Sequence, residues 1–211
     1  LTKSENEDLK PFLNPEFTSA AGIQNHFGCG EVMQSGRLNV AEFFSDLQNF
    51  HLENGNLIQE KFEYDQLDPE NSVYKNLKFF KLVFCEGMAV SKNPYFCEIP
   101  VQANKGHHIK VRLKEPLGEN LTFKKKHFFF HLNDDLYFYG GTYDRDAQNA
   151  DIDQSAIDQL TKGLQEIYPH AFEIVDVQIG FRPTVKDRRP ILGTHEKFPD
   201  LAVFNGLGAR G

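Results

Sequence analysis

The sequence predicts an α+β fold, an antiparallel mixed sheet with flanking helices. Three observations support this prediction. Strand-like stretches separated by turns fill the middle of the chain. Apolar residues recur at helical spacing over 40–50 and 156–167. A nearly continuous apolar run over 79–87 is typical of a strand with parallel neighbours. At 211 residues and 40% hydrophobic content, the chain is long enough to bury a core.

The first sixty residues divide into an arm and a helix. Residues 1–16 are polar and contain two prolines, so we expect an arm that is either loose or ordered by contact. A helix is predicted with Asn39 as its N-cap and Gly55 beyond its end. Its apolar face is formed by five residues at helical spacing, Val40, Phe43, Phe44, Leu47 and Phe50.

Strands dominate the rest of the chain. Residues 57–64 alternate apolar and polar side chains and predict a strand, and 79–87 predict a strand buried on both faces that ends in a turn at Gly87. A helix is expected to begin at Asp153 and to stop before Pro169. One antiparallel sheet is the economical arrangement of the four remaining strand-like stretches, 107–113, 121–130, 136–142 and 172–181.

Charge and composition argue against several classes of partner. The net charge of −7 is spread along the chain, so Lys124–Lys126 beside 127–130 indicate a solvated strand end rather than a nucleic-acid surface. No apolar run is long enough to span a membrane. His107 and His108 lack a second pair at ligand spacing, so no metal site is expected.

Cysteine usage indicates the compartment. The three cysteines are odd in number and widely spaced, which favours a reducing cytoplasm over a disulfide framework. Cys85 and Cys97 are interpreted as small core residues rather than as points of covalent cofactor attachment.

Several motifs occur in a recognisable order. "GFRPTVKDRRPILG" (180–193), read with "LAVFNGLGARG" (201–211), resembles the C-terminal signature of the FAD-dependent D-amino-acid oxidase family, which includes glycine and sarcosine oxidases. Three earlier stretches resemble other segments of that family: "LVFCEGMAV" (82–90), "IPVQANKGHHIKV" (99–111) and "LYFYGGT" (136–142). The resemblance covers nearly the whole chain from about Gly30.

The resemblance implies FAD as cofactor and a small amine or amino acid as substrate. Hydride transfer to the flavin would give an imine, and no catalytic side chain is expected. A homo-oligomer or a partner subunit is left open. The implied domains are a partial flavin-domain segment with its N-terminal arm (1–92), a substrate-domain sheet and helix (93–181), and a return to the flavin domain that is truncated before the C-terminal helix (182–211).

The glycine-rich end of the chain is interpreted as a cofactor loop. "GLGARG" satisfies GxGxxG, but no helix follows it, so we reject a pyrophosphate site there. In the family this loop leads into a helix whose N-terminus faces the flavin ring. The implied cofactor-binding residues are Gly87, Gly206, Gly208, Arg210 and Gly211. No strand–GxGxxG–helix unit occurs before residue 100, so we expect the middle and C-terminal parts of a longer protein that binds no FAD tightly and is inactive alone.

The implied substrate-binding residues are Arg182, Arg210, Phe128 and His127. Arg182 lies on a rigid Gly-Phe-Arg-Pro turn and would provide a two-pronged donor for a carboxylate, and the alternative is a structural arginine bound to backbone carbonyls. Arg210 could reach substrate or flavin, or be an exposed loop residue. Phe128 occupies a position where many amino-acid oxidases carry a tyrosine, and phenylalanine cannot donate that hydrogen bond. Either of the flanking histidines, His127 or His131, could compensate.

Two alternatives remain at this point. Arg188 and Arg189 beside Asp187 favour a solvated turn over a site. The whole chain could also be a non-catalytic subunit or a degenerate relative that binds a small acid or a protein partner without flavin. The missing nucleotide-binding unit favours this alternative, whereas the retained "GFRP" and Gly-rich loop oppose it.

Overall fold

The structure, a computed structural model, describes residues 10–25, 28–118, 121–147 and 149–208. The chain divides into two units, each built from three separate stretches. Unit 1 comprises 1–60, 109–140 and 158–176, and unit 2 comprises 61–108, 141–157 and 177–211. Because these stretches alternate, the chain crosses between the units five times, and both units need long-range contacts in order to fold.

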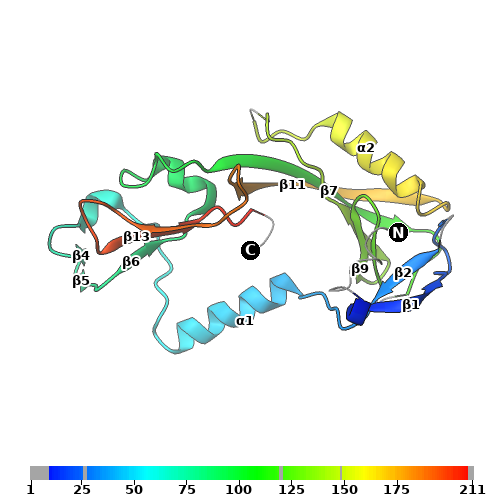
Figure 1. The fold of residues 1–211 in the computed structure, drawn as a ribbon, viewed down its shortest axis with the longest axis horizontal. Coiled ribbons are helices and arrows are strands. Elements are labelled where there is room, and N and C mark those ends of the chain that lie inside the picture. The colour runs from blue at the N-terminus through cyan, green and yellow to red at the C-terminus, as the bar shows by residue number, and fades with distance from the viewer. Residues whose placement is uncertain (1–9, 26–27, 119–120, 148, 209–211) are drawn as a thin grey trace. The chain divides into compact units, whose positions relative to one another are not determined.

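The largest sheet has five strands in the order β11-β7-β10-β9-β8 (Figure 1). Their bounds are β7 Gln102–Leu113, β8 Thr122–Lys124, β9 Phe128–Asn133, β10 Leu136–Gly140 and β11 Phe172–Thr184. The pairs β10–β9 and β8–β9 are antiparallel. The prediction that these stretches share one sheet is confirmed. Turn residues 125–127 split the expected 121–130 strand into β8 and β9, and β11 continues through Pro183 to Thr184.

The core of unit 1 lies between this sheet and helix α2 (Gln154–Gln165). Leu160 and Leu164 are fully buried, as the helical spacing predicted. Gly163 lets α2 approach the sheet closely, because a Cβ there would lie 2.7 Å from the Tyr139 hydroxyl oxygen. The sheet side of the core is rich in buried aromatic and branched side chains: Ile109, Val111, Phe129, Tyr137 and Tyr139.

Unit 2 contains two three-stranded sheets with the orders β12-β13-β6 and β3-β4-β5. Their strands are β3 Leu67–Asp68, β4 Val73–Tyr74, β5 Leu77–Lys78, β6 Leu82–Phe84, β12 Ile191–Thr194 and β13 Leu201–Asn205. β13 runs parallel to β6 and antiparallel to β12, so the mixed sheet predicted from the apolar run is confirmed. An aromatic-rich cluster forms the core: Leu67, Tyr74, Phe84, Val90, Phe96, Leu201 and Val203.

The predicted first helix is confirmed as α1 (Val40–Glu53). Asn39 caps it, since its side-chain oxygen accepts a hydrogen bond from the backbone N–H of Glu42. No side chain of α1 is buried, and Phe43, Phe44 and Phe50 are exposed. The apolar period therefore predicted the helix but not a buried face.

Four sequence predictions are wrong. Residues 57–61 form no strand, and Tyr64–Gln66 form a 3₁₀ turn, because Phe62 stacks on Tyr74 instead of alternating in a ladder. The 79–87 run forms only three strand residues, and Val83 is 46% exposed because one face of β6 is uncovered. Cys85 and Cys97 are exposed. The turn expected at 180–183 is part of β11 instead. For the N-terminal arm, the structure shows the ordered alternative: Lys10–Phe12 form a 3₁₀ turn, and β1 (Leu13–Thr18) pairs with β2 (Cys29–Val32). A further 3₁₀ helix spans Gly87–Lys92.

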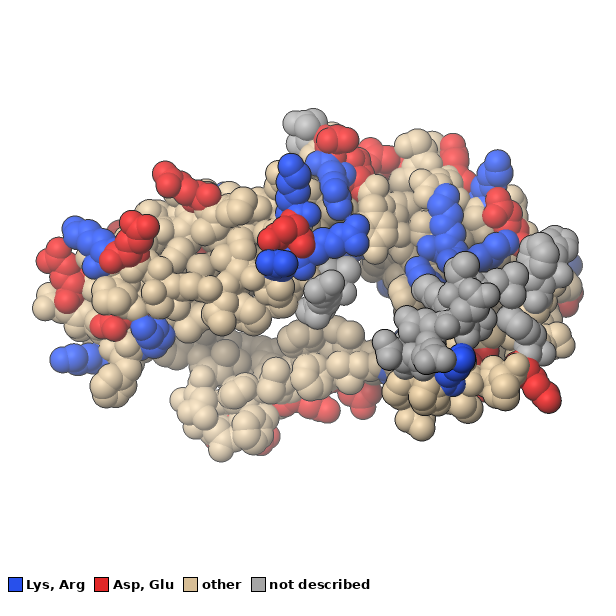
Figure 2. Space-filling model, viewed as in Figure 1, with Lys and Arg blue, Asp and Glu red and all other residues tan. Residues whose placement is uncertain are grey.

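Surface charge has no single sign. Lys and Arg side chains are interspersed with Asp and Glu side chains over the face seen in Figure 2. None of the helices in the described part of the chain is long and apolar enough to cross a bilayer. Within the same residues no group of three or more His, Cys, Asp or Glu side chains is placed to hold a metal ion.

Candidate substrate and cofactor sites

Arg182 lies on β11 over two glycines of unit 2. A Cβ at Gly106, on β7, would lie 2.8 Å from the Arg182 Nη2 atom, and a Cβ at Gly141 would lie 2.9 Å from the same atom. Real Cβ atoms do not approach a neighbour so closely, so any side chain at either position would push the guanidinium away. The two glycines therefore form a seat that holds the Arg182 guanidinium against the backbone.

The electrostatic partners of Arg182 are few. Its Nη1 donates to the carbonyl of Thr142 at 3.1 Å, and its Cζ lies 4.5 Å from the ring centroid of Tyr143, a cation–π distance. Among the described residues no carboxylate lies within ion-pair distance of Arg182, although its side chain is half-buried. A guanidinium has five N–H donors and stays charged, so most of its capacity for an anion is unused by these contacts.

The segment that supplies Thr142 and Tyr143 is bound to β7. Backbone N–H groups of Lys105 and Asp144 each donate to the other's carbonyl at 2.8 Å. Thr142 donates its N–H to the His107 carbonyl at 3.0 Å, and its hydroxyl accepts the His107 N–H at 2.8 Å. These bonds extend the ladder beyond β10 and fix the carbonyl that Arg182 contacts.

Next to this ladder, Lys105, His107 and Asp153 form a polar cluster. The Lys105 ammonium, 1% exposed, pairs with the Asp153 carboxylate at 2.9 Å, and that ammonium lowers the pKa of Asp153. The Asp153 N–H donates to His107 Nε2 at 3.1 Å, which requires that nitrogen to be unprotonated. Burial lowers the pKa of His107 below its ordinary 6.5, despite the opposing effect of Asp153. His107 is therefore neutral near pH 7, and its contact with Asp153 is a hydrogen bond rather than an ion pair.

Two glycine loops of unit 2 meet at one sheet edge. Gly87 follows β6 and Gly206 follows β13, and both loops leave the carboxyl ends of parallel strands. Gly87, Gly206 and Gly208 have φ values of 55°, 74° and 60°, which favour glycine. The Asn205 side chain donates to the Gly87 carbonyl at 2.9 Å and connects the two loops. Carboxyl ends of parallel strands are the usual place for cofactor loops in such sheets.

The other predicted substrate residues lie elsewhere. Phe128 begins β9, is half-exposed and lies under the Lys124 ammonium at 4.2 Å. His127 is buried with its ring edge against Tyr139. Both belong to unit 1, and their roles in substrate binding stay predictions. Arg210 and Gly211 lie outside the described residues. Arg188 and Arg189 are exposed, as expected of a solvated turn.

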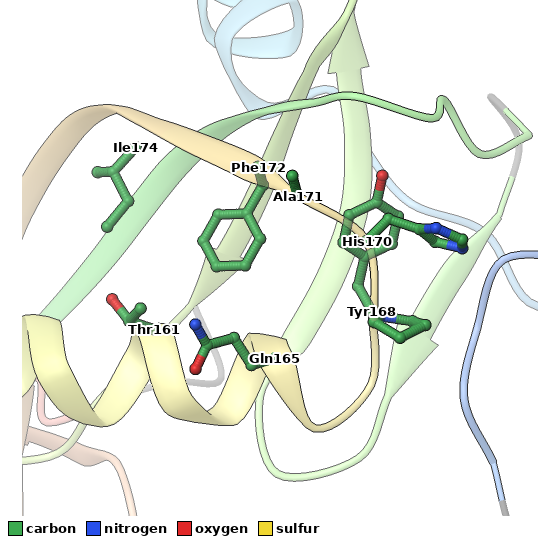
Figure 3. Close-up of a pocket in the computed structure, with 8 residues that line it drawn as sticks. Thr161, Gln165, Tyr168, His170, Ala171, Phe172 and Ile174 are labelled. Carbon is green, nitrogen blue, oxygen red and sulfur yellow. The ribbon is translucent and has the colours of Figure 1, made fainter.

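A surface groove of about 540 Å³ lies in unit 1 between α2 and the start of β11 (Figure 3). Thr161 and Gln165 lie on its helix side, and the Phe172 ring lies between helix and strand. The residues that line it are Thr161, Gln165, Tyr168, Pro169, His170, Ala171, Phe172 and Ile174. No lysine or arginine is among them, so this groove lacks a permanently charged receptor for a carboxylate, and its size alone does not make it the site.

Sequence reasoning predicted a role for Arg182 but did not predict which residues surround it. Its neighbours belong to two stretches that lie far apart in the sequence: Gly106 on β7, and Gly141, Thr142 and Tyr143 after β10. Hydrophobic periodicity does not identify these residues. The only signal was the pair of glycines in "YFYGGT" and the glycine in "NKGHH", whose contact with an arginine depends on the pairing of the strands.

Comparison with known proteins agrees with the sequence motifs. The family model described as "FAD dependent oxidoreductase" matches residues 2–211. Similar solved structures include iminodiacetate oxidase from Chelativorans sp. BNC1 (19% identity, TM-score 0.55, 65% of this chain and 40% of that chain). Glycine oxidase from Geobacillus kaustophilus matches with 22% identity, a TM-score of 0.55, and coverage of 62% of this chain and 37% of that chain.

A third structure carries the cofactor in its description. L-alpha-Glycerophosphate oxidase from Mycoplasma pneumoniae with FAD bound matches with 18% identity, a TM-score of 0.51, and coverage of 62% of this chain and 38% of that chain. At these identities the likenesses show the fold, and the matched part of each relative is about two fifths of its length. The cofactor of the family is FAD. Because the family model extends over almost all of the sequence, the chain belongs to the FAD-dependent oxidoreductase family of D-amino-acid oxidase type.

Proposed function

We propose that the chain supplies the substrate-binding part of an oxidoreductase that oxidises a carboxylate-bearing amine, with Arg182 as the carboxylate receptor. One observation carries the proposal: a half-buried guanidinium on a glycine seat, with no carboxylate partner among the described residues. A charge removed from water costs free energy unless it is paired, so this arrangement favours binding of an external anion. Glycine and iminodiacetate, the names in two of the matched structures, are amines with carboxylates.

The cofactor assignment rests on the glycine loops. Gly87, Gly206 and Gly208 have no Cβ atoms at the carboxyl edge of β6 and β13, which fits close approach of a flat ring to the backbone. We assign Arg210 and Gly211 to the same loop as Gly206. When bound, FAD would accept a hydride from the carbon that bears the amine. The chain's own residues hold and orient the substrate. We assign 1–92 and 182–211 to the flavin side and 93–181 to the substrate side.

The test compares Arg182→Lys with wild type in the full-length protein. Lysine keeps the charge but loses the two-pronged geometry, and each lost charge-assisted hydrogen bond is worth about 1.5–3 kcal/mol. We expect kcat/KM for an amino acid such as glycine to fall about ten-fold to a hundred-fold, with an unchanged flavin-to-protein absorbance ratio. Arg189→Lys, on an exposed turn, is the matched control and should change neither.

Three outcomes would count against parts of the proposal. An equal loss of flavin and turnover would place Arg182 at the cofactor instead. No loss in either would remove it from the site. Full-length protein that binds a small carboxylate but no flavin would support the non-catalytic alternative.

A further inference from the structure

The segment 141–153, here called the 141–153 loop, is bound to β7 at both ends. Its start is held by the reciprocal backbone bonds between Lys105 and Asp144, both 2.8 Å. Its end is held by Asp153, which pairs with the Lys105 ammonium at 2.9 Å and donates its N–H to His107 Nε2 at 3.1 Å. Both ends of the loop therefore depend on the two residues that flank Gly106.

The alternation of side chains on a strand separates this anchor from the arginine. Gly106 faces the Arg182 guanidinium, whereas the side chains of Lys105 and His107 point to the opposite face of β7. Lys105 is also 1% exposed. It cannot touch a ligand bound at Arg182, so any effect that it has on such a ligand must act through the loop.

The anchor is strong because the Lys105 ammonium has little else to bind. Its other side-chain contact among the described residues is with Asn149 Oδ1 at 3.5 Å, which is long for a hydrogen bond. A buried ammonium that loses its carboxylate is left desolvated, so the fold keeps Asp153, itself 40% exposed, close to β7. The loop end is thereby fixed by a charge that is buried on the strand.

We propose that Lys105 is a positioning residue for carboxylate recognition: its ion pair with Asp153 holds the 141–153 loop so that the Thr142 carbonyl and the Tyr143 ring orient the Arg182 guanidinium. The proposal rests on the proposed function of Arg182. The Tyr143 ring is 68% exposed and gains its position from its neighbours in the loop rather than from burial. Release of the loop would free the guanidinium to turn and would reduce its two-pronged geometry.

The experiment uses the full chain, with acetate as the probe and acetamide as its uncharged analogue. Affinity is measured from the NMR shift of the Tyr143 backbone amide, which every variant retains, and loop anchoring from hydrogen exchange of the Asp144 amide. We expect Lys105→Met to weaken acetate binding about five-fold or more and to speed exchange at Asp144. Lys110→Met is the matched control on the same strand. Lys110 forms its ion pair with Asp176, at 3.2 Å, and not with a residue of the loop, so this variant should change neither measurement.

A thermodynamic cycle separates positioning from stability. Lys105→Met added to Arg182→Ala should cause no further loss of acetate affinity, because the anchor acts only through the arginine. If Lys105→Met does not fold, Asp153→Asn, which keeps the shape and removes the charge, decides the question by the same two measurements.

The outcomes distinguish the two claims. If Arg182→Ala binds acetate as well as wild type, the proposed function is wrong and the role of Lys105 is wrong with it. If Arg182→Ala abolishes binding but Lys105→Met and Asp153→Asn bind acetate like wild type, only the role of Lys105 is wrong. A loss that Lys110→Met shares would also overturn it.

Discussion

The Asn205 side chain donates a hydrogen bond to the Gly87 carbonyl at 2.9 Å, and this bond joins two loops that lie far apart in the sequence. The Asn205 Oδ1 also accepts the N–H of Gly206 at 2.7 Å. One buried amide thus satisfies backbone groups in both loops that we assign to the cofactor.

The first prediction concerns this amide. Asn205→Ala leaves the Gly87 carbonyl and the Gly206 N–H without their partner, so we expect the free energy of unfolding to fall by about 1–3 kcal/mol, measured by urea denaturation. Asn71→Ala is the control, because Asn71 is exposed on a turn and its side chain donates to the carboxylate of Asp68, three residues earlier. Equal effects of the two variants would show that the link between the loops contributes nothing.

The second prediction concerns the glycine seat. Gly106→Ala places a Cβ against the Arg182 guanidinium, so acetate affinity should fall about ten-fold, while overpacking costs about 1–3 kcal/mol of stability. Gly180→Ala is the matched control, since nothing lies within 4 Å of a Cβ at that position on β11. Unchanged acetate binding in Gly106→Ala would contradict the seat.

The third prediction concerns pH. The folded pKa of His107 lies below the 6.5 of the unfolded chain, so between these values the unfolded state binds more protons. The stability that neutral His107 contributes to the folded protein is fully present above about pH 6.5 and is lost as pH falls through the folded pKa of His107. His107→Gln should flatten the decline of unfolding free energy between pH 7 and pH 5, whereas His51→Gln on α1 should not. Two parallel curves for wild type and His107→Gln would refute the assignment of a neutral His107.

The fourth prediction concerns α1. Phe44 is 60% exposed, so Phe44→Ala should change the free energy of unfolding by less than about 1 kcal/mol. Leu164→Ala in α2 removes a fully buried side chain and should cost about 2–5 kcal/mol. Thermal and urea denaturation measure both. A large loss in Phe44→Ala would mean that the α1 face is covered in the full protein.

Local pattern predicted most of the secondary structure. Periodicity located α1, α2 and the strands of the large sheet because each of these segments is long enough to show its period. It failed over 57–64, where Phe62 leaves the alternation to stack on Tyr74 at a centroid distance of 4.2 Å. A contact between distant residues decides that segment, and no short window contains it.

The candidate site was predictable only in part. The residue type and the following proline predicted Arg182 as a site residue, although the expected turn is part of β11. The seat is made by Gly106 and Gly141, which meet only after β7 lies beside β10 and β11. The anchor at Lys105 was missed for the same reason. A lysine is normally expected at the surface of a protein. Lys105 is only 1% exposed because the 141–153 loop returns to β7, a contact that the sequence alone does not show.

The parallel pairing of β6 and β13 also has a consequence for synthesis of the chain. The pair joins Leu82–Phe84 to Leu201–Val203, residues separated by more than a hundred positions. A ribosome that adds about 5–20 residues per second therefore releases β6 several seconds before its partner exists. In the folded protein the Phe84 ring packs in an aromatic cluster with Phe62, Tyr95 and Phe96. Before β13 is synthesised, no strand covers this ring. The nascent chain therefore passes through a stage in which these apolar rings are exposed to solvent, and such a stage is prone to aggregation.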